Sequence, residues 1–266
     1  MRAATELLSL LQTAPGAPLW RADELPAEDA GGPTLASGFA ELDRELPGGG
    51  WPQGQLIELL TDDAGIGELS LLAPSLAQLA QSRRSAVWVL PVDAARATPR
   101  SLEAQAVPYA PALATAGLDL ARTIFVKPAT PRESLWAVEQ SLRARHLGAV
   151  VGWLPHASGE GDFRALRRLH LLAQSHQALA FVLRSTRQAQ APSPATLRLQ
   201  LASAGAQLQV TLLKRRGRPL LDPITLQLRP AHWEQARVDA DTAPPRAVPA
   251  ATALLDVQRP LDELLA

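Results

Sequence analysis

The chain has 266 residues, a formal net charge of zero and 47% hydrophobic residues, enough to bury the core of one sizeable α/β domain. It contains no cysteine and its 5 histidines are scattered, which excludes disulfides, thiolate metal sites and a cysteine nucleophile. No signal-peptide pattern opens the sequence and no apolar run approaches a membrane span, so we expect a soluble, cytoplasmic protein without a membrane partner.

Charge is distributed unevenly along the chain. Residues 1–70 carry 3 basic and 12 acidic side chains, a net charge of −9, whereas residues 71–234 carry 20 basic and 9 acidic ones, a net charge of +11. A basic body of this kind suits an anionic partner, including DNA. The alternative is a compositional bias, because only Lys127 and Lys214 among the 26 basic residues are lysines.

The sequence before the core predicts a helix and a linker. Apolar residues at helical spacing indicate an amphipathic helix over 2–12, and the proline, glycine and acidic residues of 14–33 are typical of a linker. We expect three parts: an N-terminal helix and linker over 1–33, a core domain over 34–230, and a flexible tail over 231–266.

Within the core, strands alternate with helices. Short apolar runs predict strands at 56–60, 85–90, 123–126, 149–154 and 178–183. Helical patterns predict helices at 67–81, 131–146 and 162–174, with a helix or turn at 109–118. A hairpin of 197–202 and 207–214 follows, and then a strand at 224–228. This order predicts an α/β fold with a mostly parallel sheet flanked by helices and an antiparallel C-terminal edge.

The connection after the first core strand resembles a phosphate-binding loop that lacks the residues for binding phosphate. Such a loop needs glycines whose backbone N–H groups cradle phosphate, a lysine on the terminal phosphates and a Ser/Thr on magnesium. The glycines remain as Gly65 and Gly67, but Glu68 and Leu69 stand in the lysine and Ser/Thr positions. Because carboxylates repel a triphosphate, we expect no nucleotide or other cofactor. The alternative is an ordinary strand-to-helix connection.

A longer motif precedes this loop. Residues 35–54 read LASGFAELDRELPGGGWPQG and resemble the entry to RecA-type ATPase cores, S-G…L-D…L-G-G-G-x-P-x-G. That resemblance implies a magnesium-binding aspartate at the end of a later strand, where this chain has Trp153. Asp93 lies near the position of a catalytic glutamate, but a helix cap or turn carboxylate is the favoured interpretation. We therefore expect a RecA-like core with a degenerate P-loop and no enzyme activity.

Two groups of basic residues are candidates for DNA or partner contacts. One group lies at the end of the hairpin and comprises Lys214, Arg215, Arg216 and Arg218. Lys214 and Arg216 match a K-x-R motif of several RecA-like families. Three interpretations of the cluster are open: it contacts the phosphates of nucleic acid, it contacts an acidic partner surface, or it is a solvated hairpin tip. The other group, Arg184 and Arg187, lies where RecA-type proteins carry a DNA-contacting loop. The arginines of the predicted 162–174 helix, Arg164, Arg167 and Arg168, are interpreted as a solvated face.

Further blocks extend the resemblance over roughly residues 33–230. They are TLASGF at 34–39, LDRELPGGGWP at 42–52, PYAPAL at 108–113, GLDL at 117–120 and LLKRRG at 212–217. Together they resemble the RecA/SulA-like ImuA family. This resemblance implies a non-catalytic accessory protein of SOS-induced translesion DNA synthesis, whose partners are an inactive Y-family polymerase-like protein, an error-prone C-family DNA polymerase and RecA. The alternative is a SulA-like cell-division inhibitor that binds a tubulin-like GTPase.

The C-terminal tail carries more apolar residues than a solvated end requires. They follow a proline- and alanine-rich stretch over 231–253, and they are Leu254, Leu255, Leu261, Leu264 and Leu265. Pro260 breaks any single helix, so we expect two short anchors that bind a partner. The alternative is that the tail packs on its own core.

Overall fold

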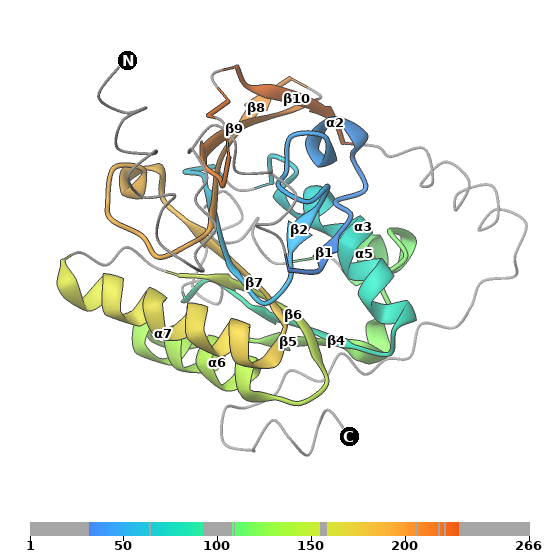
Figure 1. The fold of residues 1–266 in the computed structure, drawn as a ribbon. Coiled ribbons are helices and arrows are strands. Elements are labelled where there is room, and N and C mark those ends of the chain that lie inside the picture. The colour runs from blue at the N-terminus through green and yellow to red at the C-terminus, as the bar shows by residue number, and fades with distance from the viewer. Residues whose placement is uncertain are drawn as a thin grey trace, which may run out of the picture.

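A mixed sheet of eight strands organises the part of the chain that the structure describes (Figure 1). The computed structural model describes residues 32–63, 65–92, 108, 110–154, 159–205, 207–217, 219–220 and 222–228. The strand order is β10-β9-β8-β3-β7-β6-β4-β5. All neighbouring strands from β8 to β5 pair in parallel, whereas β9 pairs antiparallel with both β8 and β10 at one edge. The strands are β3 (Leu56–Leu60), β4 (Ser85–Val89), β5 (Thr123–Val126), β6 (Leu147–Trp153), β7 (Leu179–Arg184), β8 (Leu197–Ala204), β9 (Gln207–Lys214) and β10 (Ile224–Gln227). This arrangement is consistent with a RecA-like layout.

Helices cover both faces of the sheet. One apolar core packs α3 (Glu68–Gln81) and α5 (Ala110–Thr115) against the sheet, and a second packs α6 (Pro131–Arg143) and α7 (Glu160–His176) against the opposite face (Figure 1). Two 3₁₀ turns, η2 (Leu120–Arg122) and η3 (Thr186–Gln188), precede β5 and follow β7. Strand β3 is buried along its whole length because it lies between β7 and β8 and is covered on both faces. That position explains its nearly continuous apolar sequence.

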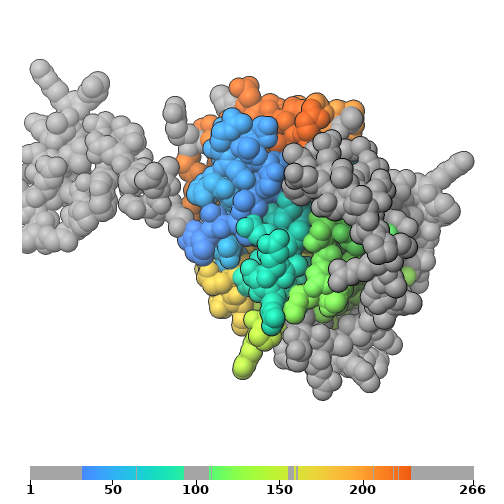
Figure 2. Space-filling view, turned by 90° about the vertical axis from the view of Figure 1, so that its right-hand side faces the viewer, coloured from blue at the N-terminus to red at the C-terminus, as the bar shows by residue number. Residues whose placement is uncertain are grey.

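The motif before the loop holds the start of the described chain on the core. Its short elements are β1 (Thr34–Leu35), α2 (Ala40–Asp43) and β2 (Trp51–Pro52), with β1 and β2 paired antiparallel. The backbone N–H of Ser37 donates to Oδ1 of Asp43 over 2.8 Å. A Cβ on Gly50 would lie 2.4 Å from the carbonyl oxygen of Leu35, so only glycine fits there. Figure 2 shows this blue segment between α3 in teal and the antiparallel strands in orange.

The predicted strands and helices of the core are confirmed, with shifted ends. The helix predicted over 131–146 ends at Arg143, because Ala144 adopts an extended conformation. The helix predicted over 162–174 is longer and runs from Glu160 to His176. The sequence did not predict β1, β2 or α2, which have too few residues to show a periodicity. The predicted N-terminal helix and C-terminal anchors lie outside the described residues. Within those residues, no helix is long and apolar enough to cross a membrane.

Candidate functional site

The loop between β3 and α3 is occupied by a side-chain carboxylate of the same chain. The carboxylate of Glu68, the first residue of α3, accepts hydrogen bonds from two loop N–H groups. Gly65 donates to Oε1 over 3.0 Å and Gly67 donates to Oε2 over 3.1 Å. Only 1% of Glu68 is exposed. Loop N–H groups and a helix N-terminus attract negative charge, so this carboxylate satisfies two donors of the loop from within the chain.

An apolar side chain covers the same loop. Gly67 has a φ of 112°, which favours glycine, and a Cβ there would lie 2.2 Å from Cδ1 of Leu228. Leu228 follows β10 and packs with the core on the α3 side. Leu69, which the resemblance aligns with a magnesium-binding Ser/Thr, is also partly buried against this core. The loop is therefore filled by a carboxylate and closed by a leucine.

Asp62 joins this loop to the end of β7. It accepts hydrogen bonds from the hydroxyl of Ser185 over 2.6 Å, the N–H of Thr186 over 3.1 Å and the hydroxyl of Thr186. The hydrogen bond from Ser185 is the largest cause that lowers the pKa of Asp62 from its ordinary value, followed by that from the Thr186 hydroxyl, and the charge of Arg187 adds to it. Asp62 is thus a structural acceptor in the folded chain.

The strand end expected to carry a metal-binding aspartate carries a packed tryptophan. Trp153 is partly buried and stacks on Trp88, with ring centroids 6.2 Å apart. Its carbonyl oxygen accepts a hydrogen bond from the hydroxyl of Ser134 over 2.9 Å. Asp93 lies outside the described residues. Among the residues that are described, no three metal-ligating side chains lie close enough to hold a metal ion.

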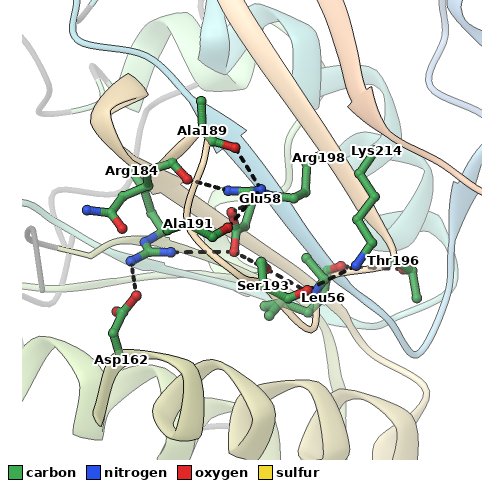
Figure 3. A network of polar contacts seen from close by, with 12 residues as sticks. Leu56, Glu58, Asp162, Arg184, Ala189, Ala191, Ser193, Thr196, Arg198 and Lys214 are labelled. Carbon is green, nitrogen blue, oxygen red and sulfur yellow. Dashed lines mark hydrogen bonds and ion pairs between the residues drawn. The ribbon is translucent and has the colours of Figure 1, made fainter. Parts of the chain in front are cut away.

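A charged network is buried between the sheet and the connection from β7 to β8 (Figure 3). Its centre is Glu58, in the middle of β3 and fully buried. Nε of Arg198 donates to Oε2 of Glu58 over 2.8 Å, and Nη1 of Arg184 lies 3.5 Å from Oε1. Arg184 also donates to Asp162 of α7 over 2.6 Å. Two arginines and two carboxylates thus neutralise one another at the junction of β3, β7, β8 and α7.

The same network fixes the connection from β7 to β8. Arg198 donates to the carbonyl oxygens of Gln188, Ala189 and Ala191 over 2.7, 3.0 and 3.2 Å. The hydroxyl of Ser193 donates to Glu58, and Nζ of Lys214 donates to the carbonyl oxygen of Ser193 over 3.0 Å. A segment held at five points along its backbone and side chains is a poor match for a mobile DNA-contacting loop.

These contacts change the interpretation of the basic candidates. Arg184 was predicted to contact DNA or a partner, but in this structure its side chain is buried against the carboxylates of Glu58 and Asp162. Arg215 is half-buried and donates to the side chain of Glu45 over 2.9 Å. Arg187 is exposed near Asp62, whereas Lys214 and Arg216 are exposed at the far end of β9. The five candidates among the described residues therefore do not form one surface. Arg218 and the five tail leucines lie outside the described residues.

Sequence reasoning missed Glu58, although it left a signal. A single glutamate at the centre of the apolar run Leu56–Leu60 has to find a cation if that run is a buried strand. Arg184 ends β7 and Arg198 lies in β8, the two neighbours of β3, but the neighbours are known only from the sheet order.

In sequence comparisons, no protein-family model and no curated protein gives a significant match to this chain.

Replacing Glu58 with Gln should lower the free energy of unfolding by about 3–5 kcal/mol, because two buried arginines lose their shared anion. Urea denaturation followed by circular dichroism measures this loss. The control is Glu139→Gln, which breaks the more exposed pair with Arg168 and should cost about 1 kcal/mol or less. Equal losses for the two variants would show that the Glu58 network does not stabilise the fold.

Replacing Asp62 with Asn should reduce thermal stability at pH 7 but progressively less in acid. The folded-state pKa of Asp62 is depressed, so its charge stabilises the fold above the unfolded pKa. This contribution disappears as the pH falls through the lower folded pKa. Melting temperatures of both proteins between pH 7 and about pH 3 should therefore converge toward the acid end of the range. A constant difference would mean that the side chain acts by shape rather than by charge.

Proposed function

We propose that this chain is a catalytically inactive RecA-like protein that serves as an accessory factor in SOS-induced translesion DNA synthesis. It acts through contacts with an inactive Y-family polymerase-like protein and an error-prone C-family DNA polymerase, and RecA is a further partner. The observation that carries the proposal is the carboxylate of Glu68, bonded to the N–H groups that a phosphate-binding loop offers to phosphate.

The electrostatics of the loop disfavour nucleotide. A phosphate that entered would compete with Glu68 for the N–H groups of Gly65 and Gly67. Two like charges about 4 Å apart repel by roughly 4 kcal/mol at an effective dielectric constant of 20, and the loop has no lysine to offset this. Leu228 also lies over the glycine that would approach a ligand. A RecA-like core that cannot bind ATP in the usual way would act through contacts with other proteins and not through ATP hydrolysis.

Two further observations support a RecA-like origin. The strand order, with β3 between β7 and β8 and an antiparallel edge beyond β8, is consistent with that layout. The sequence motif that resembles the entry to RecA-type cores forms a defined unit, in which Ser37, Asp43 and Gly50 make close backbone contacts. The polymerase partners come from the resemblance to the ImuA family.

Addition of MgATP should leave the melting temperature of the wild-type chain unchanged, because a ligand raises it only by binding the folded state. An active RecA ATPase serves as the positive control. Glu68→Gln should lower the free energy of unfolding by about 1–3 kcal/mol, since charge-assisted hydrogen bonds to the loop are weakened. Asp63→Asn, which removes the same charge from an exposed loop position, should have little effect. Magnesium-dependent ATP turnover that Glu68→Ala abolishes would refute the proposal.

The partner contact is tested with purified proteins. An inactive Y-family polymerase-like protein from the same organism should bind the full-length chain in a calorimetric titration. Deletion of residues 254–266 should weaken this binding at least tenfold while the melting temperature stays nearly unchanged, because buried leucines contribute roughly 1.5–3 kcal/mol each. Arg259→Gln, within the same tail, is the control that keeps the leucines.

Two other outcomes would contradict this assignment. Binding to the tubulin-like division GTPase in place of the polymerase-like protein would favour the SulA-like alternative. A large loss of thermal stability with partner binding intact would show that the tail packs on its own core.

A further inference from the structure

Arginines gather where the parallel strands β7, β6, β4 and β5 begin side by side at one end of the sheet. We call this region the amino edge and define it by the four segments that lead into these strands, residues 81–84, 119–122, 143–146 and 175–178. They contain five arginines and one acidic residue, Asp119, a net charge of +4 with the histidines neutral. Oδ2 of Asp119 already lies 3.6 Å from Nε of Arg122.

Two of the five arginines hold the segments of the amino edge together. Nη2 of Arg84 donates to the carbonyl oxygens of Leu147 and Gln177 over 2.6 and 3.0 Å. Nη1 of Arg122 donates to the carbonyl oxygen of Arg83 over 3.0 Å. Figure 2 shows the end of α3 in teal beside the yellow-green segment that follows α6. The four segments therefore form one connected surface, although they are far apart in the sequence.

The other three arginines, Arg83, Arg143 and Arg145, are exposed. Their guanidinium groups make no hydrogen bond or ion pair with the residues that the structure describes. Ser85 of β4 pairs in register with Leu147 of β6. Arg83 and Arg145 each lie two residues before these partners, so they enter neighbouring strands that run about 4.8 Å apart. Positive charge is thus concentrated at the amino edge without an anion of the described chain to neutralise it.

The backbone at Arg83 gives a second indication. Its φ is 57°, in the left-handed region that follows the end of a helix and that glycine or asparagine occupies at least cost. Local geometry does not account for an arginine at this position. A strained residue that presents a charged side chain to solvent is a reason to look for a ligand of that side chain.

The composition of the amino edge favours double-stranded DNA as the ligand. The large hydrophobic side chains that are exposed in the described chain, Trp136, Leu171 and Leu213, all lie outside the four segments, whereas protein interfaces have an apolar centre. The segments contain no Phe, Trp or Tyr, so they offer no platform on which the bases of a single strand could stack. A duplex needs neither feature, because it presents one phosphate charge per about 1.7 Å of its axis.

We propose that the amino edge binds the phosphate backbone of double-stranded DNA, independently of its sequence, through Arg83, Arg143 and Arg145. A guanidinium group matches the geometry of phosphate oxygens. The exposed side chains of Gln81 and Ser82 add neutral groups of the kind that contact the sugar–phosphate backbone. This surface does not rest on the proposed function, since neither the loop after β3 nor the C-terminal tail belongs to it.

The test is the fluorescence anisotropy of a labelled DNA duplex titrated with the full-length chain at several salt concentrations. Three phosphate contacts predict a slope of log K against log salt of about −2.7, since each contributes about −0.9 on a duplex. The affinity should then fall about 40-fold between 50 and 200 mM salt. Arg83→Gln with Arg145→Gln should leave a slope of about −0.9 and a decrease of only about 3.5-fold over the same range.

The matched control is Lys127→Gln with Arg132→Gln. It removes the same charge from exposed positions after β5 and in the first turn of α6, at the opposite end of the sheet, and should change neither affinity nor slope. All four substituted side chains are exposed, so both double variants should keep the wild-type melting temperature.

Three outcomes would overturn the proposal. One is absence of duplex binding at low salt, and another is an equal change of slope in the two double variants. The third is binding of polyglutamate or of phosphatidylserine vesicles without binding of the duplex, which would assign the amino edge to an acidic protein or to a membrane surface.

Discussion

The buried carboxylate of Glu58 is the interaction on which the rest of the structure depends. It lies in the central strand, where solvation is lost, and its charge is tolerable only because Arg184 and Arg198 reach it from the two adjacent strands. Once Arg198 is held there, its remaining donors hold the carbonyl groups of the connection from β7 to β8. The network therefore fixes the position of the antiparallel edge relative to the parallel sheet. A single charge at the centre of β3 organises four elements.

A second buried carboxylate is bonded within the chain at the loop between β3 and α3, where its donors are backbone N–H groups instead of arginines. There the backbone supplies the positive partial charges, through the N–H groups of Gly65 and Gly67, and Glu68 supplies the anion. In both places the chain satisfies internally a group that would otherwise require a ligand or water. This internal satisfaction stabilises the fold and leaves the loop without an open anion site.

The positions of the basic residues show why a charge count by itself is a poor guide to a binding site. Arg184 and Arg198 contribute to the basic body of the sequence, yet both form buried ion pairs with Glu58. Arg215 is bonded to Glu45 in the segment before the loop, so part of the acidic start of the chain and part of the basic body neutralise each other locally. Arg167 is exposed on α7, and Lys214 is exposed at the end of β9, where it donates to the carbonyl oxygen of Ser193.

The sequence by itself determined the order of the core strands β3 to β10 and of the helices between them, because apolar runs of strand length alternate with helical periodicity. It also placed Glu68 at the position where the resemblance to a phosphate-binding loop would require a lysine. Only the structure showed that Glu68 folds back onto the loop, through hydrogen bonds from residues one and three positions before it. The burial of Arg184 was decided by the tertiary structure, since it depends on which strands become neighbours. Strand order is set by contacts between residues far apart in the chain, such as Glu58 and Arg198, and local patterns carry no record of such pairings.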